Sequence, residues 1–440
     1  MDIPTAEPGI DFDVSFEEPY EFTKLKRSTG EVRAPRAFRG RILVHTVHDG
    51  GAIPKQFRFK PDGTPLVDPE LLEKGFVLQR DWGANHVAHL LAAELGLARY
   101  GRVRLARILM DFNRFPGSTP PSTLALQDLH AISYPYSDVL SYHQKAELLE
   151  GYYDRISDIL EAEALPGKLL CIAVHTYDEH NPSLTRRPEV SLITRPAAYQ
   201  QESRMPFGVF DPLFPDRLGE STCSRILRDR ISLNLERNGF RVSQNHPYPL
   251  PNGSLEVRAL VWYFFQYLRD RFESAHPDTR EDPAFEIVWS MLLNTNLRSA
   301  EAEALRGFLH RFRRVGRGQR ARFDKARRAY EQIESFVYDK DIIRAYRRWP
   351  KRPSCFGIEV RKDLVCHIDP DTGLPRKRTA QNEENARRIA RLIAEAIHIY
   401  FTTDREYEVN RPSRYSRPPS NPGLLDTPTI PLAPPSTRGH

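Results

Sequence analysis

Short apolar runs alternate with longer amphipathic stretches through the first 250 residues of the chain. The run Leu169–His175 (LLCIAVH) is almost entirely apolar, which is typical of a strand buried on both faces of a mainly parallel sheet. After Asp81, apolar residues recur at three- and four-residue steps, which indicates a helix. Because strands alternate with helices, the pattern predicts an α/β fold with a mainly parallel or mixed sheet flanked by helices. The other predicted strands are 41–48, 104–111, 190–194 and 240–243, and the other predicted helices are 138–163 and 221–238.

Beyond residue 254 the pattern changes to helices alone. Positions such as Phe323, Tyr330 and Val337 follow helical spacing there. A strand pattern returns only at Cys355–Val360 (CFGIEV), and the amphipathic stretch Glu384–Tyr400 follows it. We therefore predict an all-helical subdomain inserted into the α/β domain. The predicted organisation is an irregular N-terminal arm at 1–38, an α/β domain at 39–254 and 354–405, a helical basic insertion at 255–353, and a Pro-rich disordered tail at 406–440.

Composition narrows the class of protein. A hydrophobic fraction of 40% in 440 residues is enough for a sizeable core, and 4 Cys do not make a disulfide framework. The chain has neither a basic, apolar leader nor an apolar stretch of membrane-spanning length, so we expect a soluble cytoplasmic protein without a membrane partner. The net charge of +6 arises from one segment, because residues 298–352 carry 17 basic and 7 acidic side chains.

Two histidines mark a candidate catalytic edge of the predicted sheet. His48 and His175 each end an apolar strand, and in parallel α/β sheets ligands bind where the carboxyl ends of the strands converge. Two imidazoles and one carboxylate are a common ligand set for catalytic zinc. The acidic ligand is left open between Asp81, Asp49 and Asp178, with Asp81 favoured because it is predicted to cap a helix. The alternative is that each histidine is a hydrogen-bonded structural residue at a strand end.

Several motifs follow one another along the chain in a fixed order: HDGGAIP, RDWGANHVAHLL, LMDFNR, SYH, VHTYDEH, RLGESTCS, NGFRVSQNHPY and GIEVRKDL. This ordered series resembles the N-formylglutamate amidohydrolase family. They cover roughly residues 40–252 and 354–402. The resemblance implies a fold like that of the zinc carboxypeptidases and a metal-dependent hydrolase of linear amide bonds.

The resemblance also implies roles for individual residues. It assigns a divalent metal, Zn²⁺ by expectation, to His48, His175 and Asp81, and it makes Arg114 the group that holds a substrate carboxylate, a task suited to a planar guanidinium. Glu359 becomes the catalytic glutamate. Glu256 lies in the similar context SLEVRAL, but only Glu359 is followed by DxxTG and an amphipathic helix. The remaining implied residues are His143 beside Tyr142 as a catalytic group, and Asn113, Asn245 and Tyr248 in substrate binding.

The implied reaction is hydrolysis of N-formyl-L-glutamate to formate and glutamate in histidine degradation. The chain departs from the family pattern at Asp49, where Ser is usual, and at Val174, where an acid is usual. A missing carboxylate beside His175 would disturb the orientation of its ring. The alternatives are therefore hydrolysis of other N-acyl amino acids or short peptides, and a family member that binds without hydrolysing.

The basic insertion supports a hypothesis of another class. Residues 311–328 contain nine Arg or Lys and one acid, interleaved with Phe312 and Phe323, a pattern that can neutralise nucleic-acid phosphates. The simpler interpretation is a helix whose aromatic residues face the core and whose cations face solvent. The sequence leaves the oligomeric state and the role of this insertion open.

Overall fold

The protein is described by a computed structural model that covers residues 18–25, 30, 32–119, 130–195, 210–215, 222–251, 253–311, 313–339, 341–369 and 371–405. The predicted tail at 406–440 lies outside these residues. Among them, no helix combines the length and the apolar character needed to cross a bilayer.

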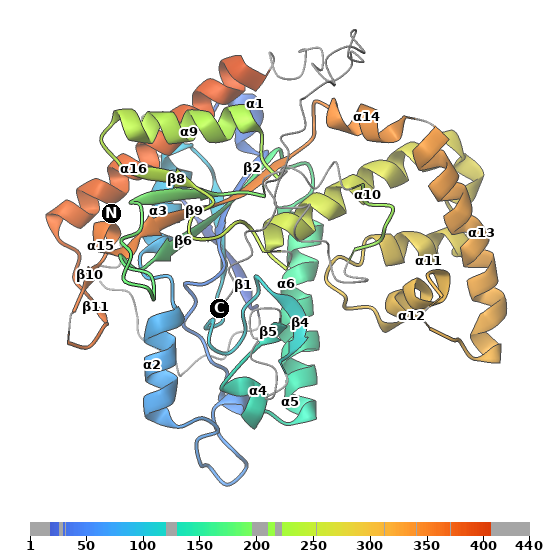
Figure 1. The fold of residues 1–440 in the computed structure, drawn as a ribbon, viewed down its shortest axis with the longest axis horizontal. Coiled ribbons are helices and arrows are strands. Elements are labelled where there is room, and N and C mark those ends of the chain that lie inside the picture. The colour runs from blue at the N-terminus through green and yellow to red at the C-terminus, as the bar shows by residue number, and fades with distance from the viewer. Residues whose placement is uncertain are drawn as a thin grey trace, which may run out of the picture.

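A seven-stranded mixed sheet forms the centre of the α/β part, which confirms the predicted fold class (Figure 1). The strand order is β1-β3-β2-β6-β9-β7-β8. The pairs β3–β2, β2–β6, β6–β9 and β7–β8 are parallel, whereas β1–β3 and β9–β7 are antiparallel. The strands are β1 Tyr20–Lys24, β3 Arg99–Val103, β2 Ile42–Thr46, β6 Leu170–Tyr177, β9 Ser354–Arg361, β7 Val190–Ile193 and β8 Val242–Gln244.

Both faces of the sheet are covered by helices, and the central strands β6 and β9 are buried along their whole length. Ile172 and Val174 of β6 point into a core shared with α3 Ala84–Glu94, α9 Arg225–Arg237 and α16 Ala380–Ile399. Because side chains alternate along a strand, Cys171 and His175 point to the opposite face, where α10 Leu255–Ala275 packs on β6 and β9. The C-terminal halves of both strands carry polar residues, among them His175 and Glu359.

The predicted helix at 138–163 is observed as a continuous helical stretch. It consists of α5 Tyr142–Glu147, a π-helical turn at Leu148–Tyr153, α6 Asp154–Ile159 and a second π-helical turn at Leu160–Ala164. The other helices of the α/β part are α1 Arg36–Arg39, α2 Pro69–Gln79, α4 Tyr136–Val139 and α15 Lys362–Val365. Two small pairs of strands complete it, β4 Phe115–Ser118 with β5 His130–Ile132 and β10 His367–Ile368 with β11 Pro375–Arg376.

Three local predictions are wrong. Residues 104–111 form turns whose apolar side chains are buried, and the strand of this region is β3, where Gly101 leaves space for the Tyr20 ring. The N-terminal arm is not wholly irregular, because Tyr20–Lys24 pairs with β3 as an edge strand. Asp81 does not cap α3 with its carboxylate: the helix begins at Ala84 after Gly83, whose φ of 87° turns the chain.

The described residues from 255 to 353 form five α-helices and a short 3₁₀ helix at Pro277–Thr279, and they contain no strand. An apolar cluster joins them, and it buries Phe323, Ala326, Tyr330, Ile333 and Val337 of α13. The burial of Phe323 and Tyr330 agrees with the simpler interpretation of this segment. Helix α10 belongs to both parts of the molecule, since its first two turns pack on the sheet and its later turns enter the helical cluster (Figure 1). That the stretch is an inserted domain stays a prediction. The helices after α10 are α11 Pro283–Leu292, α12 Ala300–Leu309, α13 Arg317–Asp339 and α14 Ile342–Arg347.

Candidate metal centre and active site

His48, Asp81 and His175 meet at the carboxyl ends of β2 and β6. One ligand atom from each lies within 4.8 Å of the others, and all three side chains are buried. Asp81 Oδ2 lies 2.9 Å from His175 Nδ1 and 3.5 Å from His48 Nδ1. Among the residues that the structure describes, no other group of three His, Cys, Asp or Glu has this spacing. The two imidazoles and one carboxylate therefore fit the donor set of a catalytic zinc site.

The two alternative acidic ligands lie elsewhere. Asp49 is buried, but its Oδ2 accepts a hydrogen bond of 2.7 Å from Arg102 Nε. Asp178 is 60% exposed and pairs with Lys362 at 2.9 Å. Asp81 lies beside His48 because its backbone N–H donates a hydrogen bond of 3.1 Å to the His48 carbonyl.

Asp111 contacts the ring nitrogen of His48 that faces away from Asp81, a role that the sequence reasoning missed. His48 Nε2 lies 2.7 Å from Asp111 Oδ1, while His48 Nδ1 faces Asp81. A carboxylate on the far nitrogen of a ligating histidine fixes its tautomer and its ring orientation. Burial would raise the pKa of Asp111, but the charges of His48 and Arg107 outweigh it and hold the pKa well below the usual range. The first residue of DFNR was the available signal.

The electrostatics of the three candidate ligands reflect their mutual contact. Burial would raise the pKa of Asp81, but hydrogen bonds from His175 and His48 outweigh it and lower the pKa. Burial would lower the pKa of His175, but its hydrogen bond to Asp81 and the nearby Glu359 raise that pKa to about 9. In the metal-free protein His175 is therefore protonated at neutral pH, and a metal ion must displace this proton to bind.

Because His175 is protonated in the folded, metal-free protein, we expect the stability of this form to depend on pH. A folded-state pKa of about 9 against an ordinary 6.5 for His175 stabilises the fold fully below pH 6.5, and the stabilisation is lost as pH rises toward 9. The free energy of unfolding should fall over this range by at most about 3 kcal/mol. Denaturation of metal-free wild type and His175→Asn at both ends of the range isolates this contribution. Identical pH profiles would contradict the ion pair.

Glu359 lies beside His175 on the neighbouring strand. The two residues are paired in the parallel register of β6 and β9, and Glu359 is 4% exposed. The hydroxyl of Tyr248 donates a hydrogen bond to the Glu359 carboxylate. Burial raises the pKa of Glu359, against the opposing charge of His175. A carboxyl with a raised pKa beside a candidate metal site has the properties of a general base.

Glu256, the competing glutamate, occupies the first turn of α10 rather than a strand. It is 1% exposed, and neither carboxylate oxygen has a hydrogen-bond partner among the described residues.

Arg114 and Arg107 converge on Asp111. Their Nε atoms lie 3.4 Å and 3.0 Å from Asp111 Oδ2. Arg107, which the sequence reasoning did not single out, also approaches Asp81 at 3.8 Å. Two guanidinium groups thus lie beside the candidate ligands, where they can attract an anionic substrate.

Two asparagines predicted to bind substrate have other partners. Asn113 Oδ1 accepts a hydrogen bond of 3.0 Å from Leu255 N, at the start of α10. Asn245 has a φ of 56°, and its Oδ1 accepts from Thr194 N at 2.7 Å, which fixes the loop before Tyr248. These contacts position loops, and a direct role in substrate binding stays a prediction.

His143 is not brought into the cluster. It lies exposed in the first turn of α5, and its ring contacts that of Tyr142 at 6.0 Å between centroids. Among the described residues, the structure records no contact between His143 and the three candidate ligands. Its catalytic role stays a prediction.

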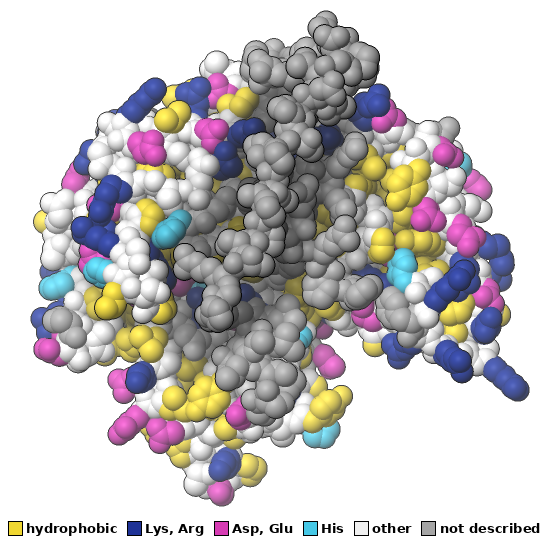
Figure 2. All heavy atoms as spheres, in the orientation of Figure 1, with side chains coloured by type: hydrophobic (Ala, Val, Ile, Leu, Met, Phe, Trp, Pro, Cys, Tyr) yellow, Lys and Arg dark blue, Asp and Glu magenta, His cyan; other side chains and the backbone are white. Residues whose placement is uncertain are grey.

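The basic stretch lies on the outer side of α13. Phe323 and Tyr330 are buried in the helical cluster, whereas Arg320, Lys325 and Arg328 are exposed. Exposed Lys and Arg side chains are visible along this edge of the molecule in Figure 2. The alternation of aromatic and basic residues thus follows from the two faces of one helix, and binding of nucleic acid or another acidic partner stays a prediction.

Comparison with known proteins agrees with this geometry. A model of the N-formylglutamate amidohydrolase family matches residues 40–261. This match spans just over half of the chain and includes His48, Asp81, His175 and the DFNR loop. The chain belongs to the N-formylglutamate amidohydrolase family. Glu359 lies outside the matched range.

Two solved structures resemble the chain more distantly. A gene product of Agrobacterium tumefaciens has 14% sequence identity and a TM-score of 0.42, covering 88% of this chain and 96% of its own. An N-formylglutamate amidohydrolase from Ralstonia eutropha JMP134 has 12% identity and a TM-score of 0.42, covering 87% of this chain and 97% of its own. A search of curated proteins found no match.

Proposed function

We propose that the protein is a metal-dependent amidohydrolase that removes the N-formyl group, or another N-acyl group, from an acidic amino acid. The observation that carries the proposal is the buried His48–Asp81–His175 group with Glu359 on the adjacent strand. Membership in the N-formylglutamate amidohydrolase family supports the reaction class.

His48, Asp81 and His175 would hold a divalent ion, by expectation Zn²⁺. When bound, such an ion lowers the pKa of a coordinated water and polarises an acyl oxygen. Asp111 keeps the Nδ1 atom of His48 directed at the site by accepting a hydrogen bond from Nε2–H. The site is buried, which strengthens every charge interaction inside it.

Glu359 would act as the general base and then as the general acid. Its raised pKa lets the carboxylate accept a proton from the attacking water and release that proton to the leaving amine. The Tyr248 hydroxyl, hydrogen-bonded to Glu359, orients the carboxylate and stabilises its charged form. Burial excludes competing water from this proton transfer.

Arg114 would bind the side-chain carboxylate of the substrate, assisted by Arg107. Both cations share one carboxylate oxygen of Asp111, and Arg114 is partly exposed. Two adjacent guanidinium groups favour a dicarboxylate, which supports an acidic amino acid such as N-formyl-L-glutamate. Use of this activity in histidine degradation, in the cytoplasm, is part of the same proposal. The runner-up is hydrolysis of other N-acyl amino acids or short peptides.

Arg114→Lys tests the substrate assignment. The variant keeps the charge but loses the planar pair of donors that matches a carboxylate, so KM for N-formyl-L-glutamate should rise by about tenfold with kcat little changed. Steady-state assays of formate release measure both constants. Unchanged KM would remove Arg114 from the binding site.

The substrate class itself is tested by a panel of N-acyl amino acids. Formate release from N-formyl-L-glutamate should exceed release from N-formyl-L-leucine, because only the former has a second carboxylate. Faster turnover of N-formyl-L-leucine would favour the runner-up.

A further inference from the structure

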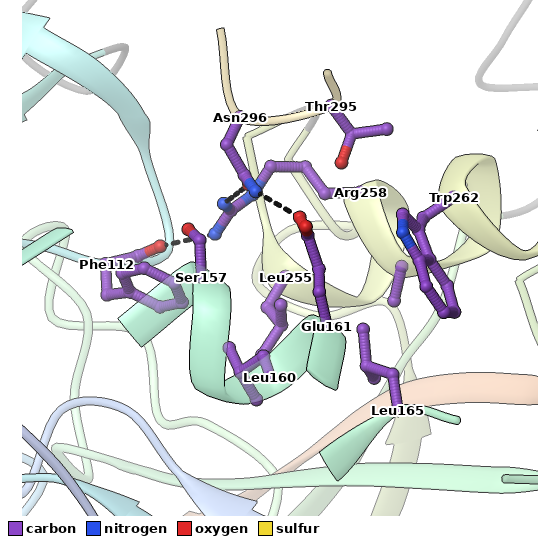
Figure 3. A pocket seen from close by; sticks show the side chains of 11 residues that line it. Phe112, Ser157, Leu160, Glu161, Leu165, Leu255, Arg258, Trp262, Thr295 and Asn296 are labelled. Atoms are coloured by element: carbon purple, nitrogen blue, oxygen red, sulfur yellow. Dashed lines mark hydrogen bonds between the residues drawn. The ribbon is translucent and has the colours of Figure 1, made fainter. Parts of the chain in front are cut away.

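Arg258 is a buried cation of α10. It connects the helices of residues 255–353 with the loop of residues 111–115. It lies in the second turn of α10 and is 1% exposed. It lines a small cavity between α10, α6 and the segment around Asn296 (Figure 3). Removing a guanidinium from water is costly unless its donors are satisfied, so its partners are informative.

The donors of Arg258 reach across the molecule rather than to a carboxylate of its own helix. Nη2 donates to the backbone carbonyl of Phe112 at 2.7 Å, Nε donates to Gly253 O at 2.9 Å, and Nη1 donates to Asn296 Oδ1. The amide of Asn296 continues the network to Glu161 at 2.8 Å (Figure 3). The guanidinium also lies over the Phe112 ring, 4.8 Å from its centroid.

The loop residues that follow Phe112 also have contacts with neighbouring segments. Beside the Arg258–Phe112 bond, Leu255 N donates to Asn113 Oδ1, and the Tyr153 hydroxyl donates to Arg114 O at 2.8 Å. Gly253 approaches so closely that a Cβ there would lie 2.9 Å from Phe115 N. The backbone of residues 112–115 is therefore held by contacts with Gly253, with α10 and with Tyr153.

This loop carries the groups that the proposed function requires. Asp111 supports His48, and Arg114 lies beside Asp111. Since Phe112 lies between these two residues, the position of its carbonyl determines where the Arg114 side chain leaves the backbone. A displacement of about 1 Å at such a point can cost about 100-fold in activity.

We propose that Arg258 is a positioning residue for Arg114, acting through the Phe112 carbonyl. Helix α10 thereby couples the helices of residues 255–353 to substrate binding. This inference rests on the proposed function for its kinetic consequences but not for its structural ones. The two can be tested separately.

Arg258→Lys is the primary variant, because lysine keeps the charge but cannot donate to three oxygens in one plane. Arg306→Lys is the matched control: Arg306 is 2% exposed in α12 and pairs with Glu303 and the Met291 carbonyl, away from the loop. If Arg258→Lys does not fold, Asn296→Ala removes one partner of the guanidinium and is measured in its place.

Hydrogen exchange of the amides of residues 112–115 tests the structural part without any assay of activity. Exchange should be about tenfold faster in Arg258→Lys and unchanged in Arg306→Lys. Equal exchange in wild type and in a folded Arg258→Lys would overturn the proposal.

The kinetic consequence is tested by comparing KM for two substrates. In Arg258→Lys, KM for N-formyl-L-glutamate should rise about tenfold, with kcat and KM for N-formyl-L-leucine nearly unchanged. An equal loss for both substrates would overturn positioning of Arg114. If the wild type hydrolyses neither compound, the proposed function fails, and the exchange experiment still decides the role of Arg258.

Discussion

Replacing His175 by alanine should remove the bound metal and the hydrolase activity together. His175 provides one of three buried donor atoms that lie within 4.8 Å of each other. Loss of a direct ligand should weaken metal binding by more than the 10- to 100-fold typical for loss of an outer-shell partner. His48→Ala should behave in the same way. Elemental analysis and formate release, measured on the same preparations, check both outcomes.

His89→Ala is a suitable control for the two ligand variants. His89 lies in α3, the helix that follows Asp81, and its ring contacts Tyr100 rather than the cluster. This variant should retain one metal ion per chain and full turnover. Activity that survives in metal-free His175→Ala would contradict the metal-dependent reaction.

Glu359→Gln should retain the metal and lose turnover. Glutamine has nearly the same shape and can accept a hydrogen bond from Tyr248, but it cannot take a proton from water. Loss of a general base lowers kcat by about 10²- to 10⁴-fold, with little change in metal content. Metal analysis together with kcat measures the separation of the two functions.

Glu256→Gln is the matched control, because Glu256 is equally buried and lies in a similar sequence context. Its carboxylate belongs to α10 and has no hydrogen-bond partner among the described residues, so its loss should leave kcat little changed. A larger loss of kcat in Glu256→Gln than in Glu359→Gln would transfer the catalytic role to α10.

The sheet and most helices were predictable because burial imposes a regular pattern on the sequence. Strands β6 and β9 are buried on both faces, and their N-terminal halves are almost entirely apolar. The strand β3 was missed because Arg99, Gly101 and Arg102 break any such pattern, and its pairing depends on the distant Tyr20. Residues 104–111 show the reverse error, since their apolar side chains are buried in turns.

The two histidines of the site were predictable from the sequence, whereas Asp81 was only favoured among three acids and Asp111 was missed. Strand ends identified His48 and His175, because the topology brings the carboxyl ends of parallel strands together. The choice among Asp81, Asp49 and Asp178 depended on tertiary contacts, such as the ion pair that Arg102 forms with Asp49.

The support of the site was hidden from the sequence for the same reason. Asp111 and His48 are 63 residues apart, and Arg258 reaches Phe112 across 146 residues. No local pattern encodes such pairs. An acid is usual in the family at the position of Val174, but here it could not reach the site. The Val174 side chain is buried in the core on the other face of the sheet. Asp81 contacts His175 instead.

The most direct test of the account is anomalous diffraction at the zinc edge from crystals of the protein grown with Zn²⁺. We predict one strong peak within bonding distance of His48, Asp81 and His175, with Glu359 beside it. A peak at another site, or an active protein with no peak between these three residues, would contradict metal binding by His48, Asp81 and His175.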